Sequence, residues 1–106
     1  MLYRYRITIE ALGKRRGAPD RDESLQFCAE NHDDLLKIVE AVRSKRLLDI
    51  EKSASLAIGL KLLSEVILEK RQDEIFAPLV LPIREFIVRL KETKTQSEQA
   101  LKMSKC

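Results

Sequence analysis

The sequence predicts an α+β fold in a single domain, with an N-terminal antiparallel β-hairpin followed by three α-helices. Apolar and polar residues alternate near the N-terminus, which is typical of half-buried strands, and from about residue 32 the apolar residues recur at helical spacing. The 106 residues suffice for one core, and 44% hydrophobic with 35% charged residues is typical of a globular protein. We expect the domain to span residues 1–92 and a polar, flexible tail to occupy residues 93–106.

Two strands are predicted, over residues 2–12 and about 24–30, with a long polar loop between them. Consecutive strands usually pair, so we expect an antiparallel hairpin. One face of each strand carries apolar side chains: Tyr3, Tyr5, Ile7, Ile9 and Ala11 in the first, and Leu25, Phe27 and Ala29 in the second.

The first helix is predicted over residues 32–46. Asn31 is a favourable N-cap residue, and Asp33 and Asp34 would then occupy the first turn, where the helix dipole favours carboxylates. The same pattern predicts that His32 belongs to this N-terminal capping cluster.

The second helix is predicted to begin after Asp49 and to run over about residues 50–71, with no proline to interrupt it. It is apolar on several sides, so we expect it at the centre of the fold. We interpret Gly59 as a point of close approach by another helix or by the hairpin. The stripe predicted to face the core consists of Leu56, Leu60, Leu63 and Ile67.

The third helix is predicted over about residues 82–92, because proline is tolerated in a first turn and disrupts a helix interior. Pro78 and Pro82 therefore favour a start near Pro82. The predicted buried face consists of Ile83, Phe86, Ile87 and Leu90.

Three segments of the chain, Tyr-Arg-Tyr-Arg-Ile-Thr-Ile-Glu (3–10), Asn-His-Asp-Asp-Leu-Leu-Lys-Ile-Val-Glu (31–40) and Leu-Ala-Ile-Gly-Leu-Lys-Leu-Leu-Ser-Glu-Val (56–66), resemble a family of small bacterial proteins. The family is Domain of Unknown Function 3861, and the resemblance covers about residues 1–90. It implies a bacterial, cytoplasmic, one-domain protein. It implies no catalytic residue, cofactor or partner.

Basic residues gather in the first part of the chain. Residues 1–21 carry a local charge of +4, whereas residues 22–40 carry −5. A basic hairpin face and loop would suit a phosphate backbone, so nucleic-acid binding is one alternative function. Glu10 on that face, the acidic run that follows and the absence of stacking aromatics there disfavour it. The candidate contact residues, for nucleic acid or another partner, are Arg4, Arg6, Lys14, Arg15, Arg16 and Arg21.

Cys28 and His32 suggest a further alternative, a thiol enzyme, because a histidine four residues away could lower the pKa of the thiol. No third orienting group accompanies them, and the chain has no phosphate loop, nucleophile elbow or zinc-ligand spacing. The sequence therefore predicts no catalytic residue, no cofactor and no metal. We interpret Cys28 and Cys106 as two free thiols rather than a disulfide.

The sequence also indicates where the protein acts. The longest run without a charge, residues 75–83, is far shorter than the ~18 residues of a membrane span, so no membrane association is expected. Arg4 and Arg6 stand where a signal peptide would be apolar. These features predict a cytoplasmic protein, and without a catalytic motif we expect a non-enzymatic interaction or regulatory module that binds an unidentified protein partner. The hairpin leaves strand edges unpaired, and the second helix has more apolar surface than the hairpin and two flanking helices would bury, so we also expect a homodimer.

Overall fold

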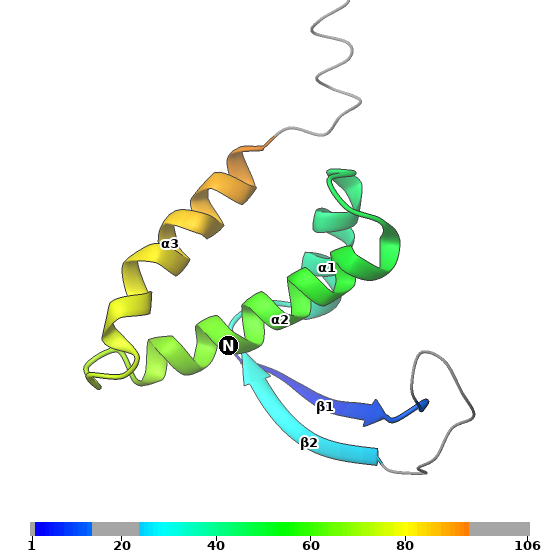
Figure 1. The fold of residues 1–106 in the computed structure, drawn as a ribbon, viewed down its shortest axis with the longest axis horizontal. Helices are drawn as coiled ribbons and strands as arrows, with labels where there is room; N and C mark the ends of the chain where they lie inside the picture. The colour runs from blue at the N-terminus through cyan, green and yellow to red at the C-terminus, as the bar shows by residue number, and fades with distance from the viewer. Residues whose placement is uncertain (1, 14–23, 94–106) are drawn as a thin grey trace, which may run out of the picture. The chain divides into compact units, whose positions relative to one another are not determined.

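The structure of the chain is a computed structural model that describes residues 2–13 and 24–93. It has the α+β architecture predicted from the sequence, with an antiparallel hairpin followed by three helices (Figure 1). The chain divides into two compact units, a hairpin unit that ends at His32 and a helical unit that begins at Asp33. Residues 14–23 of the predicted loop and residues 94–106 of the predicted tail lie outside the described residues.

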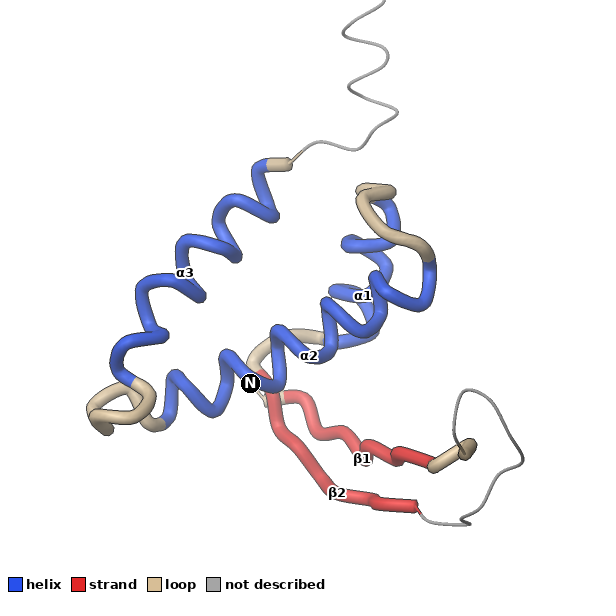
Figure 2. Tube along the Cα trace, in the orientation of Figure 1, coloured by secondary structure: helices blue, strands red, loops and turns tan. Residues whose placement is uncertain are grey.

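The hairpin unit consists of β1 (Tyr3–Glu10) and β2 (Ser24–Asn31), drawn as two paired strands in Figure 2. The antiparallel register runs from Tyr3 opposite Asn31 to Glu10 opposite Ser24. Opposed residues point to the same face of an antiparallel sheet, so this register puts the two apolar faces together.

Helix α1 (Leu35–Ser44) begins later than predicted, because Asp34 and not Asn31 is its N-cap. Asp34 Oδ1 accepts hydrogen bonds from the backbone N–H groups of Leu36, at 3.2 Å, and Lys37, at 3.5 Å. Asn31 is instead the buried last residue of β2. The prediction that Asp33 and Asp34 occupy the first helical turn was therefore wrong.

Helix α2 (Ile50–Glu69) begins as predicted. Asp49 caps it, with 2.7 Å between its Oδ1 and the Lys52 backbone nitrogen. The predicted core stripe is only partly correct, since Ile67 is buried but Leu63 is 45% exposed. The most buried positions of α2 include two small residues, Ser53 and Ala57, and Ala57 packs against Val39 and Val42 of α1.

The core of the helical unit lies where α1 and α2 pack together. Val39 and Val42 of α1 meet Ala57 of α2, and these three side chains are buried. Half-buried apolar side chains surround them: Ile38, Ala54, Leu56, Ile58 and Leu90.

Helix α3 (Ala77–Glu92) begins well before Pro82, so the predicted start was wrong. Pro78 occupies the first turn, where its missing N–H costs nothing, and Pro82 lies inside the helix. The C-terminal end of α3 is held by Lys45, whose ammonium donates to the carbonyl oxygens of Lys91, at 3.3 Å, and Thr93, at 2.7 Å. A cation at these last carbonyls also stabilises the negative end of the helix dipole.

Gly59 does not mark a close approach by another helix. A Cβ atom added there would meet nothing within 4 Å, and the position is exposed. The interpretation of Gly59 as a contact with another helix was wrong.

Candidate functional site

The apolar face of the hairpin is the first candidate surface. Ile7 lies opposite Phe27, and Ile9 lies opposite Leu25. Three of these side chains are exposed, with fractions of 55% for Ile9, 58% for Leu25 and 38% for Phe27. An apolar cross-strand cluster that is open to solvent favours contact with another protein surface.

The opposite face of the hairpin carries the arginines that the sequence singled out. Arg4 lies opposite Glu30 in the strand register, and Arg6 lies opposite Cys28. Glu10 shares this face, so two arginines and two glutamates leave it with no net charge. Lys14, Arg15, Arg16 and Arg21, the remaining candidate contacts, lie outside the described residues. The described part of the hairpin therefore presents a mixed charge pattern rather than a basic ribbon.

The two strand edges are a third feature of the hairpin. Within residues 2–13 and 24–93 the sheet has two strands, so β1 has a strand partner on one side only. A strand edge offers backbone N–H and C=O groups to a further strand. The sequence predicted a hairpin of two strands. It did not predict the register that places Arg4 opposite Glu30.

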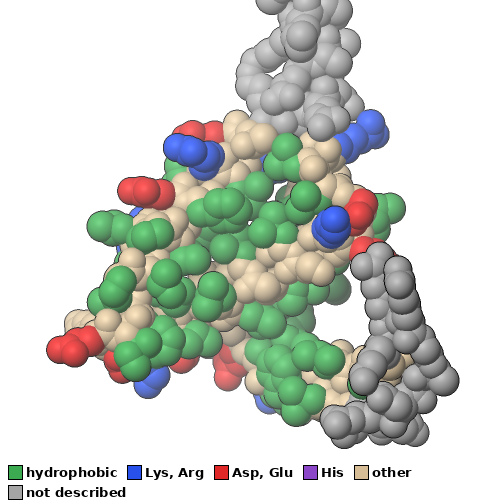
Figure 3. Space-filling view, in the orientation of Figure 1, with side chains coloured by type: hydrophobic (Ala, Val, Ile, Leu, Met, Phe, Trp, Pro, Cys, Tyr) green, Lys and Arg blue, Asp and Glu red, His purple; other side chains and the backbone are tan. Residues whose placement is uncertain are grey.

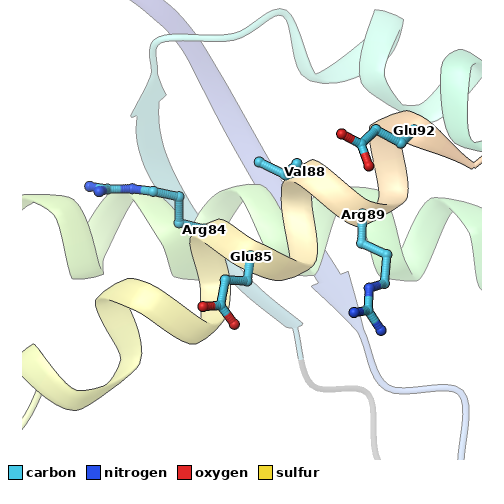
Figure 4. A pocket seen from close by; sticks show the side chains of 5 residues that line it. All are labelled: Arg84, Glu85, Val88, Arg89 and Glu92. Carbon is cyan, nitrogen blue, oxygen red and sulfur yellow. The ribbon is translucent and has the colours of Figure 1, made fainter.

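A shallow pocket lies on the outer surface of α3 and is lined by Arg84, Glu85, Val88, Arg89 and Glu92 (Figure 4). All five residues come from a single helix, and within residues 2–13 and 24–93 no second element lines the pocket. Binding sites for small molecules are concave and bury most of the ligand, and this depression lacks that shape. It is better described as the charged outer side of an amphipathic helix.

The helical unit has exposed apolar side chains of its own on α2 and α3, and Figure 3 shows hydrophobic side chains over both helices. Helix α3 has no fully buried residue, although a half-buried stripe runs along it. Phe86 was predicted on the buried face of this helix, but its side chain is 43% exposed. The exposed large side chains on these two helices are Ile50, Leu63, Val66, Leu68, Leu79, Leu81, Phe86 and Val88.

The structure does not bring Cys28 and His32 to one site. Cys28 is an exposed free cysteine on β2, and the extended strand carries the chain about 10 Å from Cys28 to Asn31 before His32 follows. Over the described ranges, no three histidine, cysteine, aspartate or glutamate side chains gather in a way that would hold a metal ion. Cys106 lies outside these ranges.

Among the described helices, none is long and apolar enough to cross a membrane.

Residues 3–92, which include both strands and all three helices, match the family Domain of Unknown Function 3861, described as having a solved structure. The chain belongs to this family. The resemblance drawn from the sequence is thereby confirmed.

A crystal structure of a protein of unknown function from Pectobacterium atrosepticum is similar to this member of the Domain of Unknown Function 3861 family. The two chains are 32% identical, with a TM-score of 0.73 over 87% of this chain and 99% of the other. A comparison with curated proteins found no match. The family thus supports the fold and leaves the function to be argued from the surfaces.

Proposed function

We propose that this family member is a small non-enzymatic interaction module that acts by binding protein surfaces and that self-associates as a homodimer. The observation that carries the proposal is the exposed apolar face of the hairpin around Ile9, Leu25 and Phe27. A two-stranded hairpin alone is marginally stable in water, and a partner that covers its apolar face would stabilise it.

The helical unit supports the same proposal. Helix α3 contributes only half-buried side chains to its own unit, while Leu79, Leu81 and Phe86 remain exposed. Exposed apolar side chains occur on two helices and on the hairpin, which is more apolar surface than isolated exposed residues account for. They favour a protein that completes its packing by association.

The proposal places the protein in the bacterial cytoplasm, where a free thiol such as Cys28 stays reduced. It assigns no catalytic role to Cys28 or His32. The second, unidentified protein partner would bind whatever apolar surface the dimer leaves open.

The experiment that tests the proposal is multi-angle light scattering of the full chain at micromolar concentration. We expect a mass twice the 12.2 kDa of one chain, falling toward one chain mass on dilution. A monomer at every concentration up to about 100 μM, where even weak specific contacts associate, would contradict self-association.

A further inference from the structure

We propose that two copies of this chain pair antiparallel through the outer edges of their β1 strands, with Ile7 facing Ile7 of the second copy. This inference rests on the proposed function and specifies its first partner and surface. The product is a four-stranded sheet with the strand order β2-β1-β1-β2 across the two copies. The edge of β1 is open to this pairing because the described sheet has no third strand.

The faces of β1 restrict the possible registers. Opposed residues of an antiparallel pair point to the same face, and a shift by one residue would put apolar side chains opposite polar ones. Apolar residues occupy the odd positions of β1 and polar residues the even positions. Two β1 strands related by a two-fold axis therefore pair odd with odd and even with even.

Charge decides among the registers that remain. Centring the pair on Tyr5 or Arg6 would set arginines of the two copies opposite each other, and centring it on Arg4 would do the same. Centring it on Ile7 sets Arg4 opposite Glu10 of the second copy, and the two-fold axis forms this pair twice. The sequence of β1 is thus self-complementary in charge.

The number of paired residues distinguishes the two registers that join opposite charges. The pair centred on Thr8 also joins opposite charges, Arg6 with Glu10, but it pairs only residues 6–10 of the strand. The pair centred on Ile7 aligns residues 4–10, nearly all of β1, and sets Tyr5 opposite Ile9 of the second copy. The longer ladder forms more backbone hydrogen bonds and covers the exposed Ile9 side chain.

The outer edge of β2 offers no comparable pairing. This strand carries one charged residue, Glu30, so no register of two β2 strands joins opposite charges. A β1 edge on a β2 edge would be a head-to-tail contact, which propagates instead of closing at two copies. The β1–β1 pairing is the one that is both closed and charge-complementary.

Glu10 gives the sharpest test, because it lies opposite the neutral Ser24 within its own hairpin. Glu10→Arg would set arginines opposite each other at both ends of the interface, and we expect the dimer dissociation constant to rise about tenfold. Arg4→Glu should raise the dissociation constant by a similar factor, because it sets carboxylates opposite each other at both ends of the interface. The matched control is Gln26→Arg, which adds a cation to the same face on β2, and it should leave the dissociation constant unchanged.

Mixing the two charge variants distinguishes pairing from simple destabilisation. In a mixed dimer, the new carboxylate at position 4 faces the new guanidinium at position 10, and the native Glu10 and Arg4 face each other. We expect equimolar Arg4→Glu and Glu10→Arg chains to recover the affinity of the wild type, as measured by sedimentation. Two weakened variants that do not recover on mixing would overturn the proposed register.

Cysteine cross-linking tests the register independently, in a background with Cys28→Ser and Cys106→Ser. Side chains directly opposed across strands lie about 5 Å apart at Cβ, so Ile7→Cys should oxidise to a covalent dimer. Ile9→Cys would lie about 13 Å from its counterpart and should stay reduced. Cross-linking at Thr8→Cys in place of Ile7→Cys would assign the other register.

The outcomes separate the two proposals. A wild-type monomer contradicts the proposed function itself. A wild-type dimer that is unaffected by Glu10→Arg and not cross-linked through Ile7→Cys retains the proposed function and overturns the β1 pairing.

Discussion

Lys61 in the middle of α2 donates to Asp33, the first residue of the helical unit, with 2.8 Å between Nζ and Oδ2. The two side chains differ in environment, since Lys61 is 11% exposed and Asp33 is 47% exposed. The bond ties the segment before α1 to α2, and it satisfies a largely buried ammonium. An unpaired buried charge is costly, whereas an exposed carboxylate without a partner is solvated by water.

The first prediction follows from this asymmetry. Asp33→Ala should lower the free energy of unfolding by about 1–2 kcal/mol, because it weakens the pairing of a buried ammonium. Lys61→Met should cost less than Asp33→Ala, since it fills the site with an apolar chain and leaves Asp33 in water. Urea melts of both variants check this, and a larger loss for Lys61→Met would contradict it.

The second prediction concerns Gly59. Glycine inside a helix is less stable than alanine, and a Cβ atom at this position meets nothing within 4 Å. Gly59→Ala should therefore raise the free energy of unfolding by about 0.5–1 kcal/mol. A loss of stability in thermal or urea melts would show that a partner surface covers this part of α2. Ala57→Gly, in the buried core of the same helix, serves as the opposite control and should destabilise.

The third prediction compares two similar residues on one helix. Ile67 is 3% exposed and Leu63 is 45% exposed. Ile67→Ala should cost about 2–5 kcal/mol, because it removes buried apolar volume, while Leu63→Ala should cost under about 1 kcal/mol in the isolated chain. Equal losses in a urea melt of the monomer would show that the burial assigned to α2 is wrong. A loss for Leu63→Ala confined to the associated state would locate Leu63 in the interface.

The stripe on α2 also shows what the sequence alone was able to predict. The existence and order of the strands and helices followed from the period of the apolar residues, and the cap at Asp49 followed from the preference for aspartate at a helix N-terminus. The buried face of α2 did not, because the helix is apolar on several sides and periodicity does not choose among them. Ser53 and Ala57 are buried on that face. Because both residues are small, a search for large apolar residues does not find them.

Two boundaries were misplaced for local reasons. Asn31 and Asp34 are both favourable N-caps, and the pairing of Asn31 with Tyr3 in the sheet decides between them. Pro82 removes one helical hydrogen bond, to the carbonyl of Pro78, and α3 continues through it. The half-buried stripe that includes Val80 and Ile83 on either side of Pro82 favours this continuation.

The candidate surfaces were predictable only in part. Strand alternation placed Arg4 and Arg6 on one face, but the strand register is needed to set Glu30 opposite Arg4. Sequence spacing does not fix the register, because Glu10 and Ser24, the facing ends of the two strands, are far apart in the sequence. Strand alternation already placed Glu10 beside the two arginines, and the structure added Glu30 to the same face.

The last prediction concerns nucleic acid. Arg4 and Arg6 share their face with Glu10 and Glu30, so a phosphate backbone on that face would meet as many anions as cations. We expect no retention of the wild-type chain on single-stranded or double-stranded DNA, or on RNA, at about 0.15 M salt.

Fluorescence anisotropy with labelled oligonucleotides across a salt series provides the measurement. The variant with Lys14, Arg15 and Arg16 all replaced by alanine is the matched comparison, because it removes three of the four cations in the segment between the strands and leaves Arg21. With both proteins, we expect the anisotropy of the oligonucleotide to stay at its unbound value across the salt series. Tight binding by the wild type whose logarithmic salt slope falls by about 3 in the triple variant would instead establish that these three residues contact phosphate.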